Sequence, residues 1–239
     1  MGLLRQAVYS RLDAGECATG LGGDRKAWVK IMLQTETVFK IAFGVWIILF
    51  FIPIGYAHRK AMREHGSRFA QCANEYPPLL WVRCLLGFPL WAFLIDWLFS
   101  AHWFPWACVS LPVWARWCGV GFGGVLVGLM MWTMLALGSN YRGTMELHPN
   151  HKLITHGPYR FVRHPMNVVF PLISIVLFLM SANWILGVLT LILLATISIV
   201  RSTIEERQLI DRFGDEYRAY MRRTGRFSPR LRWRRGGRS

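Results

Sequence analysis

Apolar residues are arranged along this chain in five long blocks separated by polar stretches. The blocks cover roughly residues 38–57, 79–100, 117–138, 167–180 and 183–200. Runs of about 18 or more apolar residues are typical of helices that cross a bilayer and are rare in soluble domains. The pattern therefore predicts an all-α integral membrane protein with about five transmembrane helices.

The last two blocks are separated only by Ser181-Ala182-Asn183. The block 167–180 would rise only about 21 Å as a helix, which is less than the roughly 30 Å of a bilayer core. We therefore expect these two blocks to form a tight helical hairpin with one short arm. Such a hairpin places the start of the fourth helix beside the end of the fifth.

After residue 200 the pattern changes to that of an amphipathic helix, with apolar residues at three- and four-residue spacing. We expect Gly214 to interrupt this C-terminal cytoplasmic helix and Asp215 to cap a second short one. The stretch 1–34 is interpreted as a mobile or surface-lying leader, and 226–239 as a basic tail. The apolar positions of the amphipathic helix are Leu209, Ile210, Phe213, Tyr217, Tyr220 and Met221.

The formal net charge is +15, with 28 Lys and Arg against 13 Asp and Glu. The stretches 58–78, 139–166 and 201–239 together carry 20 of the basic residues, whereas the stretches on the alternate side carry six. Positive charge gathers on the cytoplasmic side of membrane proteins, so we expect a cytoplasmic C-terminus and an N-terminus on the other side. The basic residues then favour contact with anionic lipid headgroups, and we expect no nucleic-acid partner. The charge says nothing of the oligomeric state.

Residues that could bind a metal are too sparse to predict a metal site. The five cysteines form no CxxC motif and no disulfide framework. His148 and His151 form one HxxH, with Glu146 and His156 nearby, but di-iron sites in membrane enzymes need several such clusters. We therefore expect no metal.

Glycines in the third apolar block spell GxGxxG at Gly119, Gly121 and Gly124, but no strand precedes them. The pairs Gly119/Gly123 and Gly124/Gly128 fit close packing of transmembrane helices better. The block therefore predicts a packed helix and no nucleotide-binding loop.

Two polar segments carry the candidate chemistry. The segment 151–165 makes a turn at Gly157-Pro158 and ends with Pro165, which suits the first turn of a helix whose free N–H groups could bind an anion. Glu205-Glu206 follow the fifth block within one turn. Since the hairpin brings the two segments together, the acids could meet the basic residues Arg160, Arg163 and His164. The structural alternatives are a capped basic loop, an Arg201–Glu205 pair, and a pair of Glu206 with an arginine of the preceding loop.

The same two segments carry a family resemblance. Residues 153–165, LITHGPYRFVRHP, closely resemble the GPYRxVRHP signature of the isoprenylcysteine carboxyl methyltransferase family, which is related to phospholipid N-methyltransferases. Residues 205–220 are similar to the family's second block, EExxLxxxFGxxYxxY, and Pro229 follows as in the family. The resemblance covers roughly residues 115–229.

This resemblance implies a membrane methyltransferase domain over residues 35–225, whose part 139–225 encloses S-adenosylmethionine at the cytoplasmic side. A lipophilic methyl acceptor would enter from the bilayer, and its reacting group (carboxylate, amine, thiol or hydroxyl) stays open. Arg163 and Glu206 would organise the reaction centre. By match to the family's motifs, the cofactor site would comprise Leu153, Gly157, Tyr159, His164, Pro165 and Glu205.

One position departs from the family's pattern. The family continues RHPxY, often with a small residue two positions later, whereas this chain has Asn167 and Val169. A buried amide in an apolar tunnel costs about 1–3 kcal/mol when unpaired. We therefore expect Asn167 to bind a polar group of the acceptor, the cofactor or a loop, unless it only satisfies backbone at the start of the fourth helix.

Two other classes of function are weighed against a methyltransferase. Membrane sterol or steroid reductases that use NADPH have a related C-terminal architecture and an Arg-His block, but an Asn-Tyr follows that block, and no Tyr follows Asn167 here. A non-catalytic membrane scaffold could retain the same fold. Cofactor binding would separate the three.

Overall fold

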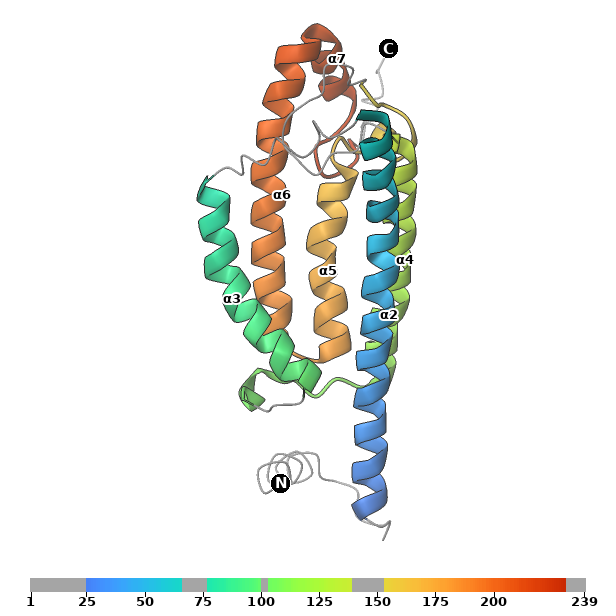
Figure 1. The fold of residues 1–239 in the computed structure, drawn as a ribbon, viewed down its shortest axis with the longest axis vertical. Coiled ribbons are helices and arrows are strands. Elements are labelled where there is room, and N and C mark those ends of the chain that lie inside the picture. Colours follow the sequence, from blue (N-terminus) through green and yellow to red (C-terminus); the bar gives the residue numbers. More distant parts are fainter. Residues whose placement is uncertain (1–24, 66–76, 100–102, 139–152, 231–239) are drawn as a thin grey trace, which may run out of the picture.

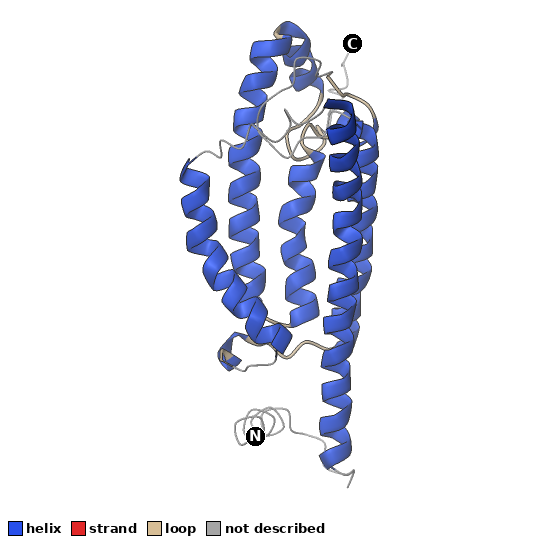
Figure 2. Cartoon of the chain, viewed as in Figure 1, coloured by secondary structure: helices blue, strands red, loops and turns tan. Residues whose placement is uncertain are grey.

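A computed structural model describes residues 25–65, 77–99, 103–138 and 153–230 of the chain. Most of these residues are helical, and the structure contains no strand among them (Figure 2). The fold class expected from the apolar pattern is therefore confirmed. The five long helices are α2 (Arg25–His65), α3 (Pro77–Phe99), α4 (Val113–Leu137), α5 (Pro165–Ser181) and α6 (Trp184–Phe213).

Successive long helices run in alternate directions along the bundle (Figure 1). At one end of the bundle α2, α4 and α6 therefore end and α3 and α5 begin. Within the described residues, α2, α3, α4 and α6 are each long and apolar enough to cross a membrane. The α5 helix is apolar but has 17 residues and rises about 25 Å. It is thus the short arm that the sequence predicts.

The first helix is longer than its apolar block. α2 has 41 residues, begins at Arg25 within the stretch interpreted as a leader, and continues past Pro53. Its apolar part, Gln34–Lys60, matches the expected span. Residues 1–24 lie outside the described residues.

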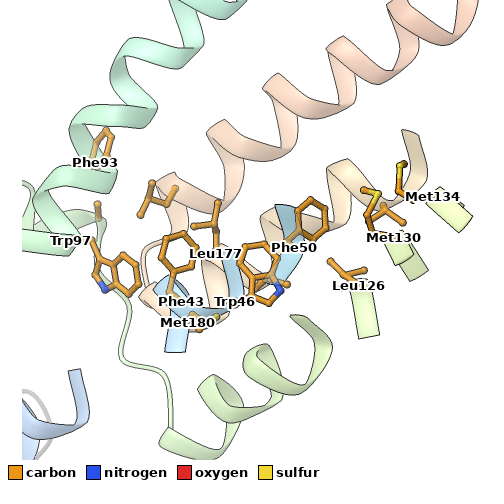
Figure 3. Packing of buried hydrophobic residues seen from close by; sticks show 14 of the residues in the cluster. Phe43, Trp46, Phe50, Phe93, Trp97, Leu126, Met130, Met134, Leu177 and Met180 are labelled. Atoms are coloured by element: carbon orange, nitrogen blue, oxygen red, sulfur yellow. The ribbon is translucent and has the colours of Figure 1, made fainter. Parts of the chain in front are cut away.

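The main core lies where α2, α4 and α5 pack together (Figure 3). Aromatic side chains of α2 form its centre: Phe43 stacks on Trp46 and meets the edge of Trp97 from α3. A Cβ on Gly123 would lie 2.7 Å from the Trp46 ring, which leaves no room for a side chain there. The core therefore needs this glycine so that α2 and α4 can approach closely.

Of the two glycine pairs that we interpreted as packing motifs, only one is packed. A Cβ on Gly119 would lie 2.7 Å from the Leu179 side chain of α5, so Gly119 and Gly123 both face neighbouring helices. A Cβ on Gly124 or on Gly128 would meet no atom within 4 Å among the described residues. The prediction of helix packing is confirmed for the first pair and does not hold within this chain for the second.

The turn between α5 and α6 is fixed by three residues. Ala182 adopts a left-handed conformation (φ 51°), and the Asn183 side chain accepts a 3.0 Å hydrogen bond from the Leu186 amide as the N-cap of α6. The Ala182 carbonyl also accepts from the Val109 amide at 2.7 Å. The predicted hairpin is confirmed, and the chain before α4 is tied to it.

An ion pair and a group of exposed tryptophans lie at the hairpin end of the bundle. Arg116 of α4 is buried and forms an ion pair with Glu36 of α2, while its guanidinium donates to the Met180 carbonyl at the end of α5. Asp96 near the end of α3 accepts from the Trp103 amide at 2.7 Å, so its partner is backbone. Exposed indoles gather around the same end, at Trp103, Trp106, Trp114, Trp117 and Trp184.

Candidate active site

The loop that leads into α5 is shaped by Gly157. This residue has φ +61°, which favours glycine, and begins the short 3-10 helix η4 (Gly157–Arg160). A Cβ there would lie 3.0 Å from the Ala136 side chain of α4. Gly157 is therefore required for the turn and for close packing of the loop on α4. Pro165 occupies the first turn of α5, as predicted.

A second apolar cluster supports this loop from the C-terminal side. All six apolar positions of the predicted amphipathic helix belong to it, and Leu153 of the loop packs against it. The Tyr220 hydroxyl donates a 2.6 Å hydrogen bond to the Tyr159 carbonyl. Burial raises the pKa of Tyr220 to about 12, so this hydroxyl keeps its proton. The cluster therefore holds the loop through packing and through this bond.

The helix break at Gly214 lies where the sequence predicts it, but the N-cap of the helix that follows is not the predicted residue. α6 continues without interruption from the apolar block to Phe213, and Gly214, with φ +51°, begins α7 (Asp215–Arg223) as its N-cap. The expectation that Asp215 is the cap is wrong. Asp215 lies in the first turn, where its carboxylate suits the helix dipole and pairs with Arg218 at 3.1 Å.

Glu206 is the centre of a network that joins three segments. Its Oε1 accepts a 2.9 Å hydrogen bond from Nε of Arg163, lies 2.9 Å from Nη2 of the same guanidinium as an ion pair, and lies 3.2 Å from Nε2 of His164. Arg226 approaches its other oxygen at 3.6 Å. The expected meeting of the acids with the basic loop is thus confirmed, and Glu206 is engaged by three cationic or ionisable side chains.

Glu205 differs from its neighbour in exposure. Its side chain is 46% exposed, against 12% for Glu206, and its carboxylate lies 3.5 Å from Nδ1 of His164. Burial alone would lower the pKa of His164, but the hydrogen bonds to both glutamates outweigh it and raise the pKa. His164 therefore lies between two carboxylates that favour its protonated form, one enclosed and one accessible.

Backbone bonds fix Arg163 and His164 from the other side. The Arg163 amide donates to the Gly225 carbonyl at 2.8 Å, and the His164 amide donates to the Arg226 carbonyl at 3.2 Å. The Arg163 guanidinium also donates to the carbonyls of Thr224 and Met221. We call residues 224–228 the strap, because they cross over the start of α5. The packed structure thus extends past residue 225, where the sequence suggests that the tail begins.

Asn167 lies in the first turn of α5 and is buried. In the part of the chain that the structure describes, its amide makes no hydrogen bond, so it does not satisfy backbone there. The hydroxyl of Tyr217 is likewise buried and has no hydrogen-bond partner among the described residues. Burial raises the pKa of Tyr217, so this group stays a donor. Two buried polar groups near the network thus have capacity for a ligand.

Sequence reasoning identified Arg163, His164, Glu205 and Glu206 but missed the strap. Arg226 was assigned to a headgroup-binding tail on its basic surroundings, and no motif distinguishes it from the arginines that follow. Glu146, His148 and His151 lie outside the described residues. The sequence signal that could have indicated the strap is a glycine, Gly225, within this basic run. In the structure, a Cβ there would lie 1.8 Å from the Ser228 carbonyl.

Comparisons with known proteins point to one family. Residues 122–211 match the sequence model of the isoprenylcysteine carboxyl methyltransferase (ICMT) family. The chain is also similar to methanethiol S-methyltransferase 1 of Bradyrhizobium diazoefficiens, with 44% identity over 78 residues. That alignment covers 32% of this chain and 25% of the relative, so it spans a quarter of the relative's length. The resemblance to the isoprenylcysteine carboxyl methyltransferase family is therefore confirmed for residues 122–211, the stretch that supplies Arg163, His164 and Glu206.

Proposed function

We propose that this chain is a membrane-embedded methyltransferase that uses S-adenosylmethionine as the methyl donor. The observation that carries the proposal is the Arg163–Glu206 ion pair, because it joins the two sequence blocks on which the family resemblance rests. Both residues lie within the stretch matched to the family. The blocks thus form one site at the end of the bundle where α5 begins and α6 ends (Figure 1).

The chemistry of the site suits this cofactor. S-adenosylmethionine presents an ammonium, a sulfonium and a ribose diol, all of which favour carboxylate partners. Glu205 offers an accessible carboxylate beside His164, whereas Glu206 is already engaged by Arg163 and Arg226. When bound, the cofactor supplies a methyl group activated by the sulfonium. Glu205 and His164, with Tyr159, Pro165 and backbone near Leu153 and Gly157, are the groups that would hold it.

In the proposed methyl transfer, the protein's own residues contribute positioning and charge. His164 lies between Glu205 and Glu206, and its hydrogen bonds to both glutamates raise its pKa, so its part is to orient the accessible Glu205 carboxylate. Arg163 fixes Glu206 and, through its bonds to the strap, the start of α5. Methyl transfer depends chiefly on alignment of donor and acceptor, which a rigid network of this kind provides.

We infer that the acceptor is lipophilic and carries a thiol. The relative from Bradyrhizobium is named for a thiol acceptor, and its alignment covers only part of each chain. The buried Asn167 amide, where the family has Tyr, supports an acceptor with a polar head over a purely apolar prenyl group. Carboxylate, amine and hydroxyl acceptors are the alternatives that an activity screen distinguishes.

Charge supports a cytoplasmic site in a multi-pass membrane protein. The basic stretches that alternate along the chain include the loop before α5 and everything after α6. These would face the cytoplasm and anionic headgroups. Tags at the two termini should differ in protease accessibility in sealed vesicles, with the C-terminal tag on the cytoplasmic side. Tags on the same side would contradict the five-helix topology.

Cofactor binding tests the proposed function directly. Purified protein titrated with S-adenosylhomocysteine in a calorimeter should bind with an affinity in the micromolar range, whereas NADPH should give no heat. Transfer of a labelled methyl group to a panel of lipophilic thiols, amines and prenylcysteine then identifies the acceptor. Folded protein that binds NADPH would support a reductase, and folded protein that binds neither ligand would support a scaffold.

A further inference from the structure

Arg226 closes a ring of interactions around the start of α5. Its carbonyl accepts from the His164 amide at 3.2 Å, and the His164 side chain lies 3.2 Å from Glu206. Glu206 in turn lies 3.6 Å from the Arg226 guanidinium. One residue of the strap therefore contacts His164 through its backbone and Glu206 through its side chain.

The Arg226 side chain is held in this place by a second anchor. Its Nη2 donates a 2.6 Å hydrogen bond to the Thr203 hydroxyl, one turn of α6 before Glu206. The hydroxyl itself donates to the Ile199 carbonyl at 2.8 Å. The guanidinium is thus held between the Thr203 hydroxyl and the second carboxylate oxygen of Glu206, Oε2, whereas Arg163 contacts Oε1.

The backbone turn of the strap depends on Gly225. A Cβ on Gly225 would lie 1.8 Å from the Ser228 carbonyl, so the turn from 225 to 228 requires glycine. The same residue's carbonyl accepts from the Arg163 amide at 2.8 Å. The turn therefore fixes the backbone position of Arg226 and the direction in which its side chain leaves the backbone.

We propose that Arg226 is a positioning residue of the candidate site, which acts on His164 by engaging the second oxygen of Glu206. The assignment of a site to these residues rests on the proposed function, but the positioning role rests on the ring of contacts alone. With Arg163 and Arg226 on its two oxygens, Glu206 has less negative charge to share with His164. The imidazole is then left to interact with the exposed Glu205.

This role predicts a change in the titration of His164. Among the described residues, the charged or titratable groups that face its imidazole or its two carboxylate partners are Glu205 and Glu206 from α6, Arg163 from the loop, Arg226 from the strap, Tyr159 from η4 and Tyr217 from α7. Removal of one positive charge from this set favours the protonated imidazole. Arg226→Gln should therefore raise the pKa of His164, by about half a unit or more.

The experiment follows His164 directly by NMR. Full-length protein with labelled histidine is titrated in detergent micelles, and the His164 signal is assigned by its loss in His164→Gln. We expect a higher pKa in Arg226→Gln and a value near that of the native protein in Arg226→Lys, which restores the charge. Arg230→Gln is the matched control, because Arg230 lies just beyond the strap, is exposed and bonds to the Arg222 carbonyl.

An unchanged or lower pKa of His164 in folded Arg226→Gln overturns the proposal, as does an equal rise in Arg230→Gln. If Arg226→Gln does not fold, Thr203→Val takes its place: it removes the anchor and should raise the same pKa by a smaller amount, and no rise would overturn the proposal. Titration with S-adenosylhomocysteine is run on the same samples. Failure of that ligand to bind the native protein would contradict the proposed function, while the pKa comparison would still decide the role of Arg226.

Discussion

Both ends of the bundle contain a buried arginine paired with a glutamate, but the two pairs differ in what surrounds them. At the hairpin end, Arg116 bonds to Glu36 and to the Met180 carbonyl, and its guanidinium lies 4.1 Å from the Phe39 ring centre. At the other end, Arg163 bonds to Glu206 and to strap carbonyls. Only the second pair has a further acid and a histidine beside it among the described residues.

This difference shows what distinguishes a candidate ligand site from an ion pair that only holds helices together. Arg116 ties three helices together and caps the end of α5, and the contacts around its guanidinium account for its charge. Around Arg163 there are two carboxylates: Glu206 pairs with the arginine, and Glu205 is a second one that is accessible. A buried ion pair alone is weak evidence of function, whereas an additional ionisable group that is open to a ligand supports it.

The largest expected effect separates the two arginines. Removing either buried arginine by Arg116→Ala or Arg163→Ala should destabilise the fold by about 1–3 kcal/mol for each buried acceptor left without its donor, because the Met180 or the Thr224 carbonyl then loses its guanidinium partner. Among molecules that stay folded, only Arg163→Ala should lose affinity for S-adenosylhomocysteine. Unfolding in detergent and calorimetry measure the two quantities. Equal loss of binding in folded Arg116→Ala would show that the ends are not functionally distinct.

The next effect separates the two glutamates. Glu205→Gln should lower cofactor affinity about 10- to 150-fold, which corresponds to the loss of roughly 1.5–3 kcal/mol from a charge-assisted bond. Its stability should change by less than about 1 kcal/mol, because the side chain is largely exposed. Glu206→Gln should instead destabilise the fold. Glu205→Gln with native affinity would indicate that Glu205 only forms surface pairs.

The pH dependence of stability tests the histidine that distinguishes the site end. Since the pKa of His164 is higher in the folded than in the unfolded protein, its contribution is complete below the unfolded value of about 6.5 and is lost as pH rises through the folded value. The free energy of unfolding should therefore fall as pH rises above about 6.5, by about 1.4 kcal/mol per unit of pKa difference. Chemical unfolding of His164→Gln should lack this slope. The same slope in that variant would assign it to another group.

The smallest expected effect concerns acceptor choice. Asn167→Tyr restores the family's residue at a buried position, so it should favour prenylcysteine over polar-headed thiols by several-fold, with little change in cofactor affinity. The substitution removes the unpaired Asn167 amide, whose burial in an apolar site costs about 1–3 kcal/mol of free energy. An activity screen across thiols, amines and prenylcysteine checks this. Identical selectivity in both proteins would show that Asn167 has no part in acceptor choice.

Features set by neighbouring residues were predictable from sequence. The three-residue break at 181–183 gave the hairpin, and the spacing of apolar residues after 200 gave the cluster under the loop. The meeting of the acids at 205–206 with the basic loop before α5 followed from the hairpin, whereas the specific pairing of Arg163 with Glu206 is seen in the structure. A family motif identified the same residues independently.

Features that depend on distant partners were not predictable. Arg116 is one basic residue beside an apolar block, and its partner Glu36 lies 80 positions earlier. Arg226 belongs to a run of arginines whose average property suggests a solvated tail, and only the turn at Gly225 selects it for Glu206. Asp215 fits a capping pattern, but the left-handed Gly214 occupies that place.

The indoles around the hairpin end have a consequence for depth in the bilayer. Tryptophan side chains settle at the level of the lipid headgroups, so this ring fixes one end of the bundle at one interface. From there α5 rises only about 25 Å, while a bilayer core is about 30 Å thick. The start of α5 therefore lies near the boundary between acyl chains and headgroups of the opposite leaflet. A molecule with an apolar tail can present its head there while its tail stays in the lipid.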